Sequence, residues 1–205
     1  MSLLSPEFLL TSLIVVASPG TGAIYTIAAG LTQGARAAAL AAFACTLGIL
    51  PHMAAAITGL AALLHQSALA FDLIKYAGVA YLLWMAWLTL QEHGPLQVES
   101  RAPRPTRAVL AEGVAINLLN PKLSIFFFAF LPQFVSTTDP TPVLTMTALS
   151  LVFMAMTFGI FALYGTFAAR MRDRVLSRPT VLAWLRRGFA TAFVLLGARL
   201  AFTQR

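Results

Sequence analysis

The sequence predicts an all-α, polytopic membrane protein whose six transmembrane helices form two inverted three-helix repeats. Three observations lead to this fold class. Apolar residues make up 59% of the 205 residues, and charged residues make up only 10%, against ~25% in a typical soluble domain. The apolar residues gather in long runs, each close to the ~20 residues that cross a bilayer as a helix. Two of these runs are interrupted by a proline at matching positions in the two halves of the chain.

This composition excludes a soluble globular enzyme, a disordered chain and a disulfide-stapled secreted domain. The single cysteine, Cys45, cannot form an internal disulfide or a paired-thiol redox site. In a soluble protein the net charge of +7 would suggest a nucleic-acid partner. Here the positive residues lie in a few short loops, so we expect these loops to contact anionic lipid and no nucleic acid.

The apolar runs place six spans along the chain. The final run is short for a bilayer and contains Arg199, whose side chain must reach the interface. A proline-rich linker at 93–107 divides a single transmembrane domain into repeat one, at 1–92, and repeat two, at 108–205. The six predicted spans cover residues 8–31, 37–64, 73–90, 112–135, 143–169 and 188–203.

Lysine and arginine predict the orientation, because they are more frequent in cytoplasmic loops. The loops after the first, third and fifth spans carry ten of these residues and the opposite side carries three. We therefore expect both termini to be non-cytoplasmic. The ten are Arg36, Arg101, Arg104, Arg107, Arg170, Arg172, Arg174, Arg178, Arg186 and Arg187, and the three are Lys75, Arg199 and Arg205.

The first and fourth spans are each expected to break at a proline. Proline has no backbone N–H and clashes with the carbonyl four residues earlier, which is Val15 for Pro19 and Asn117 for Pro121. The two prolines lie half the chain length apart. Discontinuous helices in corresponding positions of two inverted repeats are typical of secondary transporters, which bind their substrate between them. A packing kink is the alternative, because single prolines are common in membrane helices.

Unwound backbone in hydrocarbon must be satisfied by a partner, and a polar ligand can provide one. The helix that restarts after Gly20 directs free N–H groups toward an anion, while the freed carbonyls favour an ammonium group. A zwitterionic amino acid carries both groups, and Lys122, a costly residue within a span, adds a partner for the carboxylate. The predicted substrate-binding residues are Pro19, Gly20, Thr21, Gly22, Asn117, Asn120, Pro121 and Lys122.

Further polar residues in or near the spans are candidates for coupling and gating. His52, Lys122 and Glu112 could exchange protons, with an interfacial role as the alternative for Glu112 and a packing role for His52. Asp72 and Lys75 can pair at i and i+3, either to gate the outer side or to anchor the third span. We expect no organic cofactor and no metal site. The sequence leaves open whether the protein forms a homodimer.

Two other functions were considered from the residues alone. A divalent-metal exporter would need clustered His, Cys or carboxylate ligands, and no span holds two of them at a suitable spacing. A membrane-embedded serine protease could be imagined from His52 and Ser124, but the chain has no activated-serine turn of the G-x-S-x-G type. We therefore expect the protein not to be an enzyme.

The run from Asn117 to Lys122, with the Phe126–Phe128 and Leu131–Phe134 segments that follow it, resembles the fourth-span signature of the LysE/RhtB family of amino-acid exporters. Ser18-Pro19-Gly20 and the stretch from Lys75 to Leu82 resemble other landmarks of that family, in the family's order. The resemblance covers nearly the whole chain. It implies a bacterial inner-membrane exporter of amino acids or close derivatives, driven by the proton motive force, with no organic cofactor.

The sequence departs from the family pattern at two positions. Thr21 stands where family members usually carry a second proline, and Ile49 stands where many relatives carry an acidic residue. The missing carboxylate argues against a cationic substrate and removes the family's usual candidate for proton coupling. We therefore expect a neutral or small polar substrate.

Overall fold

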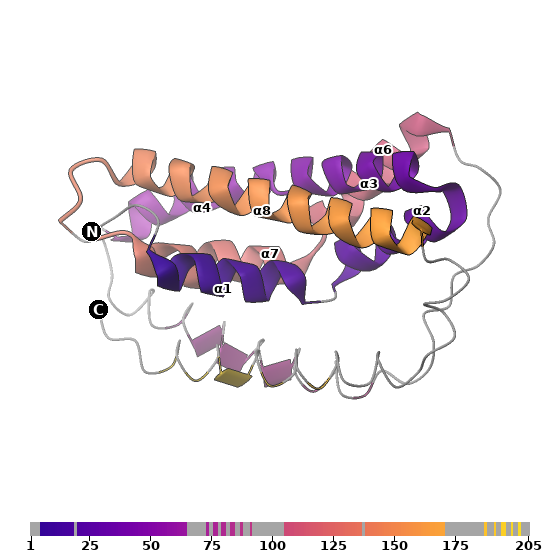
Figure 1. Ribbon diagram of the computed structural model, residues 1–205. Helices are drawn as coiled ribbons and strands as arrows, with labels where there is room; N and C mark the ends of the chain where they lie inside the picture. Colours follow the sequence, from indigo (N-terminus) through magenta and orange to yellow (C-terminus); the bar gives the residue numbers. More distant parts are fainter. Residues whose placement is uncertain are drawn as a thin grey trace.

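The structure is a computed structural model that describes residues 5–18, 20–64, 105–136 and 138–170, with single positions between 73 and 91 and between 187 and 201. All regular secondary structure in these residues is helical, as the sequence predicts (Figure 1). The third and sixth predicted spans, the 93–107 linker up to Arg104 and most of the arginine-rich loop after Arg170 lie outside the described residues.

The first predicted span is broken, as expected from its Ser18-Pro19-Gly20 sequence. Helix α1, Pro6–Ala17, begins with the Ser5 side chain accepting a hydrogen bond from the Phe8 N–H at 3.1 Å. Helix α2, Thr21–Gln33, restarts after Gly20 at 56° to α1. Pro19 itself lies outside the described residues, but the two helix ends that flank it agree with its predicted effect.

The second predicted span, 37–64, has a local interruption. The chain turns at Gly34 (φ 88°) and forms α3, Ala35–Leu47, and α4, Leu50–Leu64, with an interruption at Gly48 and Ile49. Pro51 has no N–H for the Leu47 carbonyl, and the Ile49 N–H turns back to the Thr46 carbonyl at 3.1 Å. The interruption is local, because Ala35–Gly59 remains one apolar segment long enough to span a membrane.

The fourth predicted span is also broken, between α6, Thr106–Leu118, and α7, Pro121–Ile125, with a bend of 48°. After α7 the backbone widens into a π-helix, η1 (Phe126–Phe130), and then tightens into a 3₁₀ turn, η2 (Leu131–Phe134). Pro132 accounts for this change of winding, because it cannot donate a helical hydrogen bond to the carbonyl four residues earlier. The confirmed break at Leu119 and Asn120 leaves the two halves of this span at an angle.

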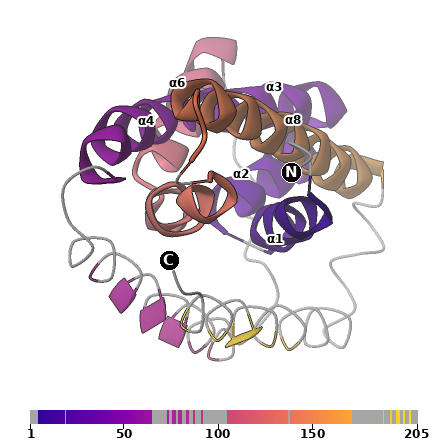
Figure 2. The ribbon, with the colours of Figure 1, turned by 90° about the vertical axis from the view of Figure 1, so that its left-hand side faces the viewer.

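The fifth predicted span is a single helix, α8, Pro142–Arg170. Together, α8, the α3–α4 segment and the two bent helix pairs provide up to four membrane spans among the described residues. Helix α8 packs against α2 and α3, and α3 packs against α6 (Figures 1 and 2). Small residues allow these close approaches: a Cβ on Gly48 would lie 2.7 Å from the Val114 carbonyl oxygen.

The two broken segments lie side by side and run in opposite directions. At one end the rings of Phe8 and Phe134 are 5.3 Å apart, edge to face. At the other end the Tyr25 hydroxyl donates to the Val109 carbonyl at 3.0 Å. Chain order therefore increases along one segment while it decreases along the other, and the two breaks meet in the middle (Figures 1 and 2).

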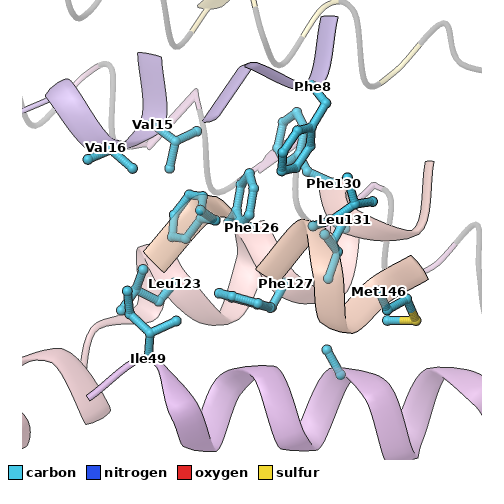
Figure 3. Packing of buried hydrophobic residues seen from close by; sticks show 14 of the residues in the cluster. Phe8, Val15, Val16, Ile49, Leu123, Phe126, Phe127, Phe130, Leu131 and Met146 are labelled. Carbon is cyan, nitrogen blue, oxygen red and sulfur yellow. The ribbon is translucent and has the colours of Figure 1, made fainter. Parts of the chain in front are cut away.

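An aromatic cluster holds the halves of these segments beside α8. Figure 3 shows Phe8 and Val15 of α1 directed toward the phenylalanines of the second broken segment. The Phe126 ring stacks on Phe153 of α8 with centroids 4.1 Å apart, and Phe127 meets Phe153 edge to face at 5.5 Å. Offset and edge-to-face aromatic pairs each contribute about 0.5–1.5 kcal/mol beyond area burial. This packing fixes η1, which directly follows α7, against α8.

Candidate functional site

The first break exposes the Val15 carbonyl, and Lys122 from the other half of the chain satisfies it. The Lys122 Nζ donates to the Val15 and Ser18 carbonyl oxygens, both at 3.0 Å, and to the Ser18 Oγ at 3.2 Å. The Ser18 hydroxyl itself donates to the Val15 carbonyl at 2.8 Å. Lys122 is only 6% exposed, so all three ammonium hydrogens are used inside the protein.

The second break exposes the Asn117 carbonyl, and His52 from the first half of the chain satisfies it. The His52 Nε2 lies 3.0 Å from this oxygen. Because a carbonyl oxygen only accepts, Nε2 carries the hydrogen, and the Ser124 hydroxyl can then donate to the His52 Nδ1 across 3.2 Å. Both ring nitrogens of the imidazole are therefore engaged.

The two contacts are reciprocal. Each break lacks one helical hydrogen bond because of a proline, and each orphaned carbonyl receives a side chain from the opposite half of the chain. In both halves the donating residue directly follows a proline, Pro51 for His52 and Pro121 for Lys122. The Val15 oxygen also accepts the Ser18 hydroxyl, and the Asn117 oxygen also accepts the Asn120 N–H at 3.1 Å. Lys122 and His52 therefore each add a second hydrogen bond to a buried carbonyl, and these bonds tie the two halves of the chain together.

Two asparagines organise the second break. The Asn120 Oδ1 accepts from the Lys122 backbone N–H at 3.1 Å and so begins α7, as asparagine commonly does at helix starts. Its Nδ2 contacts the Asn117 Oδ1 at 3.4 Å, and the Asn117 Nδ2 donates to the Cys45 carbonyl at 2.7 Å. Both side chains are buried, and the bond to Cys45 ties the break to α3.

Two glycines allow the breaks to approach each other. A Cβ on Gly20 would lie 2.8 Å from the Lys122 Nζ. A Cβ on Gly22 would collide with the Asn117 Oδ1 and lie 2.9 Å from a ring carbon of Phe161. Gly20 precedes α2 without a side-chain cap, so the first N–H groups of α2 begin beside the Lys122 ammonium. The site thus combines backbone donors, backbone acceptors and one buried cation.

The structure brings most of the predicted site residues together. Gly20, Gly22, Asn117, Asn120 and Lys122 meet at the facing breaks. Thr21 and Pro121 begin α2 and α7 but are exposed in the structure, and Glu112 lies half-buried on α6, more than one turn before Asn117. Pro19, Asp72 and Lys75 lie outside the described residues.

Sequence reasoning did not assign a role to Ser18 or to the Cys45 carbonyl, and it considered Ser124 only as a possible enzyme residue. The position of Ser18 directly before Pro19 was the available signal, because serine can bond its own helix end. The bond between Asn117 and Cys45 had no signal in the sequence, because the backbone carbonyl of any residue type could have filled that place.

The charge balance of the site is uneven. Among the residues that the structure describes, no aspartate or glutamate is buried, whereas Lys122 is. An ionisable residue within a membrane span is costly and usually marks a functional site, and the Lys122 ammonium supplies a positive charge to which an anionic group can be attracted. Within the same described part of the chain, no three His, Cys, Asp or Glu side chains are placed to hold a metal ion. The arrangement is therefore suited to a small molecule that carries both an anionic and a hydrogen-donating group.

The chain is similar over most of its length to known membrane proteins. The family model described as LysE type translocator matches residues 13–204. An uncharacterized membrane protein of Vibrio cholerae serotype O1 is 32% identical over 95% of this chain and 94% of its own. A homoserine/homoserine lactone efflux protein of Salmonella typhi is 31% identical over the same shares, and a leucine efflux protein of Enterobacter sp. is 28% identical over 80% of each chain. No solved structure matches.

Proposed function

The chain belongs to the LysE type translocator family, and we propose that it exports a small amino acid across the bacterial inner membrane. Two of its named relatives are efflux proteins for homoserine or its lactone and for leucine, and both amino acids carry a neutral side chain. These relatives match this chain over 80% or more of its length, which supports a transport function for it.

The observation that carries the proposal is the meeting of two broken helices around buried backbone groups. The carbonyls of Val15 and Ser18 accept an ammonium group at 3.0 Å, and Lys122 is a cation without a buried carboxylate partner among the described residues. The α-ammonium and α-carboxylate of an amino acid match these two features. The substrate site then comprises Gly20, Gly22, Asn117, Asn120 and Lys122, with Pro19, Thr21 and Pro121 shaping the breaks.

A neutral side chain on the substrate is favoured by Ile49. This residue is fully buried, in the turn between α3 and α4 directly after Gly48, where it offers no charge to a cationic substrate. Replacing a carboxylate by an aliphatic side chain removes the partner that a lysine-like or arginine-like side chain needs. We therefore assign neutral amino acids to this site.

Proton exchange provides the driving force in this proposal. His52 and Lys122 each sit on a break and can each gain or lose a proton, whereas Glu112 is set apart on α6. In this proposal the proton gradient across the inner membrane drives export. Both termini are non-cytoplasmic, because most lysines and arginines lie in the loops on the opposite side. Asp72 and Lys75, which lie outside the described residues, are the proposed outer gate.

The experiment that tests the function feeds dipeptides to bacterial cells that lack their own amino-acid exporters. Intracellular peptidases release the amino acids, and expression of the protein should lower the intracellular level of its substrate and raise the external level. A neutral amino acid such as leucine or homoserine is the expected result. The proposal is overturned if every amino acid has the same level with and without the protein. If the cells also gain resistance to divalent metal ions, the protein is a metal exporter instead.

A further inference from the structure

The Lys122 ammonium occupies the place that a substrate ammonium would need. It fills a cradle of three oxygen acceptors at the first break, from the Val15 carbonyl and from the carbonyl and hydroxyl of Ser18, at 3.0–3.2 Å. A primary ammonium has three hydrogens, and this cradle satisfies all of them. Any other ammonium entering the break must compete with Lys122 for the same oxygens.

The surroundings of Lys122 favour its release when a carboxylate arrives. The Lys122 Nζ is bonded only to neutral oxygens, and no carboxylate is buried in the described residues. The bonds from the ammonium to these neutral oxygens are already charge-assisted, but a carboxylate adds the Coulomb attraction between opposite charges, which is stronger in a buried site than in water. An ammonium that holds three neutral oxygens therefore gains by turning to an anion, provided that another donor takes its former place.

The first break is closely packed around Lys122 and also holds one polar group without a hydrogen bond. Gly20 presents no side chain to the Lys122 Nζ, which lies 2.8 Å from where a Cβ would be. The hydroxyl of Ser12, three residues before Val15 and on the same face of α1, is buried and has no hydrogen-bond partner among the described residues. Buried hydroxyls are normally bonded, so Ser12 is available to a polar group that enters beside it.

We propose that Lys122 is an internal surrogate for the substrate's ammonium group, and that an amino acid binds by displacing it. The substrate ammonium takes the oxygens of Val15 and Ser18, and the released Lys122 ammonium pairs with the substrate carboxylate. The structure is then the closed, substrate-free form. This inference rests on the proposed function and narrows the substrate class to molecules with both a free α-amino group and a free carboxylate.

The exchange has a consequence for molecules that carry only one of the two groups. An amino-acid amide has the ammonium but offers no anion to Lys122, so the displaced lysine would remain buried without a partner, which is costly. An N-acetyl amino acid has the carboxylate but no ammonium for the cradle. The intact protein should therefore reject both kinds of analogue.

The test measures binding to the purified full-length protein in lipid nanodiscs by calorimetry. The probes are the neutral amino acids and homoserine, each compared with its amide, and Lys122→Met is compared with the wild type. We expect the wild type to bind the amino acid at least tenfold more tightly than the amide. In Lys122→Met the cradle is empty, so the amide should bind at least tenfold more tightly than it does to the wild type, while the amino acid loses at least tenfold.

The gain of amide binding separates displacement from simpler roles. If Lys122 only supported the fold, both ligands would bind Lys122→Met more weakly. If Lys122 only paired with the carboxylate, amide binding would not change. Either result overturns the inference. Equal binding of the amino acid and its amide by the wild type overturns it as well, and this measurement does not depend on whether Lys122→Met folds.

A matched control is Thr157→Val. The Thr157 hydroxyl is buried and donates only within its own helix, to the Phe153 carbonyl at 2.9 Å, so both affinities should stay within about twofold of the wild type. Failure of the wild type to bind any amino acid in the panel would overturn the proposed function itself. Amino-acid binding without the gain in Lys122→Met would overturn only the displacement of Lys122.

Discussion

Lys122 and His52 each donate to a backbone carbonyl that a proline leaves without its helical partner. Removing a buried donor exposes its acceptor to a cost of ~1–3 kcal/mol. These residues therefore combine a structural role with the ability to exchange a proton or a ligand. A binding site between two broken helices needs side chains of this kind. They bond the backbone carbonyls at the breaks, and a substrate can replace those bonds.

Substitution of the break residues should stop transport without preventing membrane insertion. Asn120→Ala removes the hydrogen bond that caps the start of α7, which lowers stability by ~1 kcal/mol, and it also removes the contact with Asn117. Lys122→Ala removes the ammonium from the first break. We expect each variant to reach the membrane in normal amounts and to lose export at least tenfold, as measured by efflux from dipeptide-loaded cells and by immunoblots of membranes.

The control for this pair is Thr58→Ala on α4. The Thr58 hydroxyl is exposed and bonds only carbonyls of its own helix, Ala54 and Ala55, so export should be unaffected. Near-normal efflux from both Asn120→Ala and Lys122→Ala would contradict the assignment of the site to the facing breaks.

His52 should determine how export responds to pH. In His52→Gln the amide nitrogen can still donate to the Asn117 carbonyl, but the side chain no longer titrates. We expect a flatter dependence of export on pH for His52→Gln and for His52→Ala, measured as efflux between pH 5.5 and 8. Ser124→Ala keeps the imidazole and should retain a pH dependence. A profile identical to the wild type in both His52 variants would remove His52 from the coupling scheme.

At the scale of the elements, proline positions determined which helices break. The breaks at Ser18–Gly20 and at Leu119–Asn120 were predictable, because Pro19 and Pro121 each orphan a carbonyl in an apolar run. Pro51 carried the signal of a kink in the second span, but the sequence did not predict that the interruption would lie at Gly48 and Ile49. There the local turn depends on how closely α6 approaches Gly48, with the Asn117 Cβ only 2.8 Å from where a glycine Cβ would lie, and this contact is invisible in the sequence.

Gly48 should therefore tolerate no side chain. Gly48→Ala would press a methyl group against the Val114 carbonyl and Asn117, and overpacking of this kind typically costs ~1–3 kcal/mol. Gly59→Ala, in the same apolar segment, meets nothing within 4 Å and should be neutral or stabilise the helix by up to ~1 kcal/mol. Thermal unfolding of the purified variants measures the difference, and equal melting temperatures would disprove the close α3–α6 contact.

The start of α8 depends on Asp139. Its carboxylate accepts from the Thr145 hydroxyl at 2.7 Å and from the Thr141 N–H at 2.8 Å, and these hydrogen bonds lower the pKa of Asp139 from its ordinary value of 3.8. The stabilisation is present above that ordinary pKa and is lost as the pH falls through the lowered one. Asp139→Asn should thus lower the melting temperature at pH 7, and this difference should shrink as the pH falls below the ordinary pKa of 3.8; a difference that persists unchanged at low pH would refute this role.

For the whole molecule, the central feature is that two broken segments lie antiparallel with their breaks in contact. Half-chain spacing of Pro19 and Pro121 predicted this relation, because corresponding positions of inverted repeats meet at a shared axis. The sequence could not predict that Lys122 would cross to Val15 while His52 crossed to Asn117. Those two contacts depend on how four helices are rotated about their own axes relative to one another. The periodic pattern of apolar residues in one helix does not determine the rotation of the helix beside it.

The most direct measurement of this central feature is whether an amino acid protects the facing breaks from chemical labelling. Single cysteines at Thr21→Cys and Leu119→Cys, in a Cys45→Ala background, would be labelled with a small thiol reagent in membranes, with Leu163→Cys on the exposed face of α8 as the control. The transported amino acid should slow labelling at both breaks and leave Leu163→Cys unchanged. Equal labelling rates at the breaks with and without the amino acid would contradict a binding site between them.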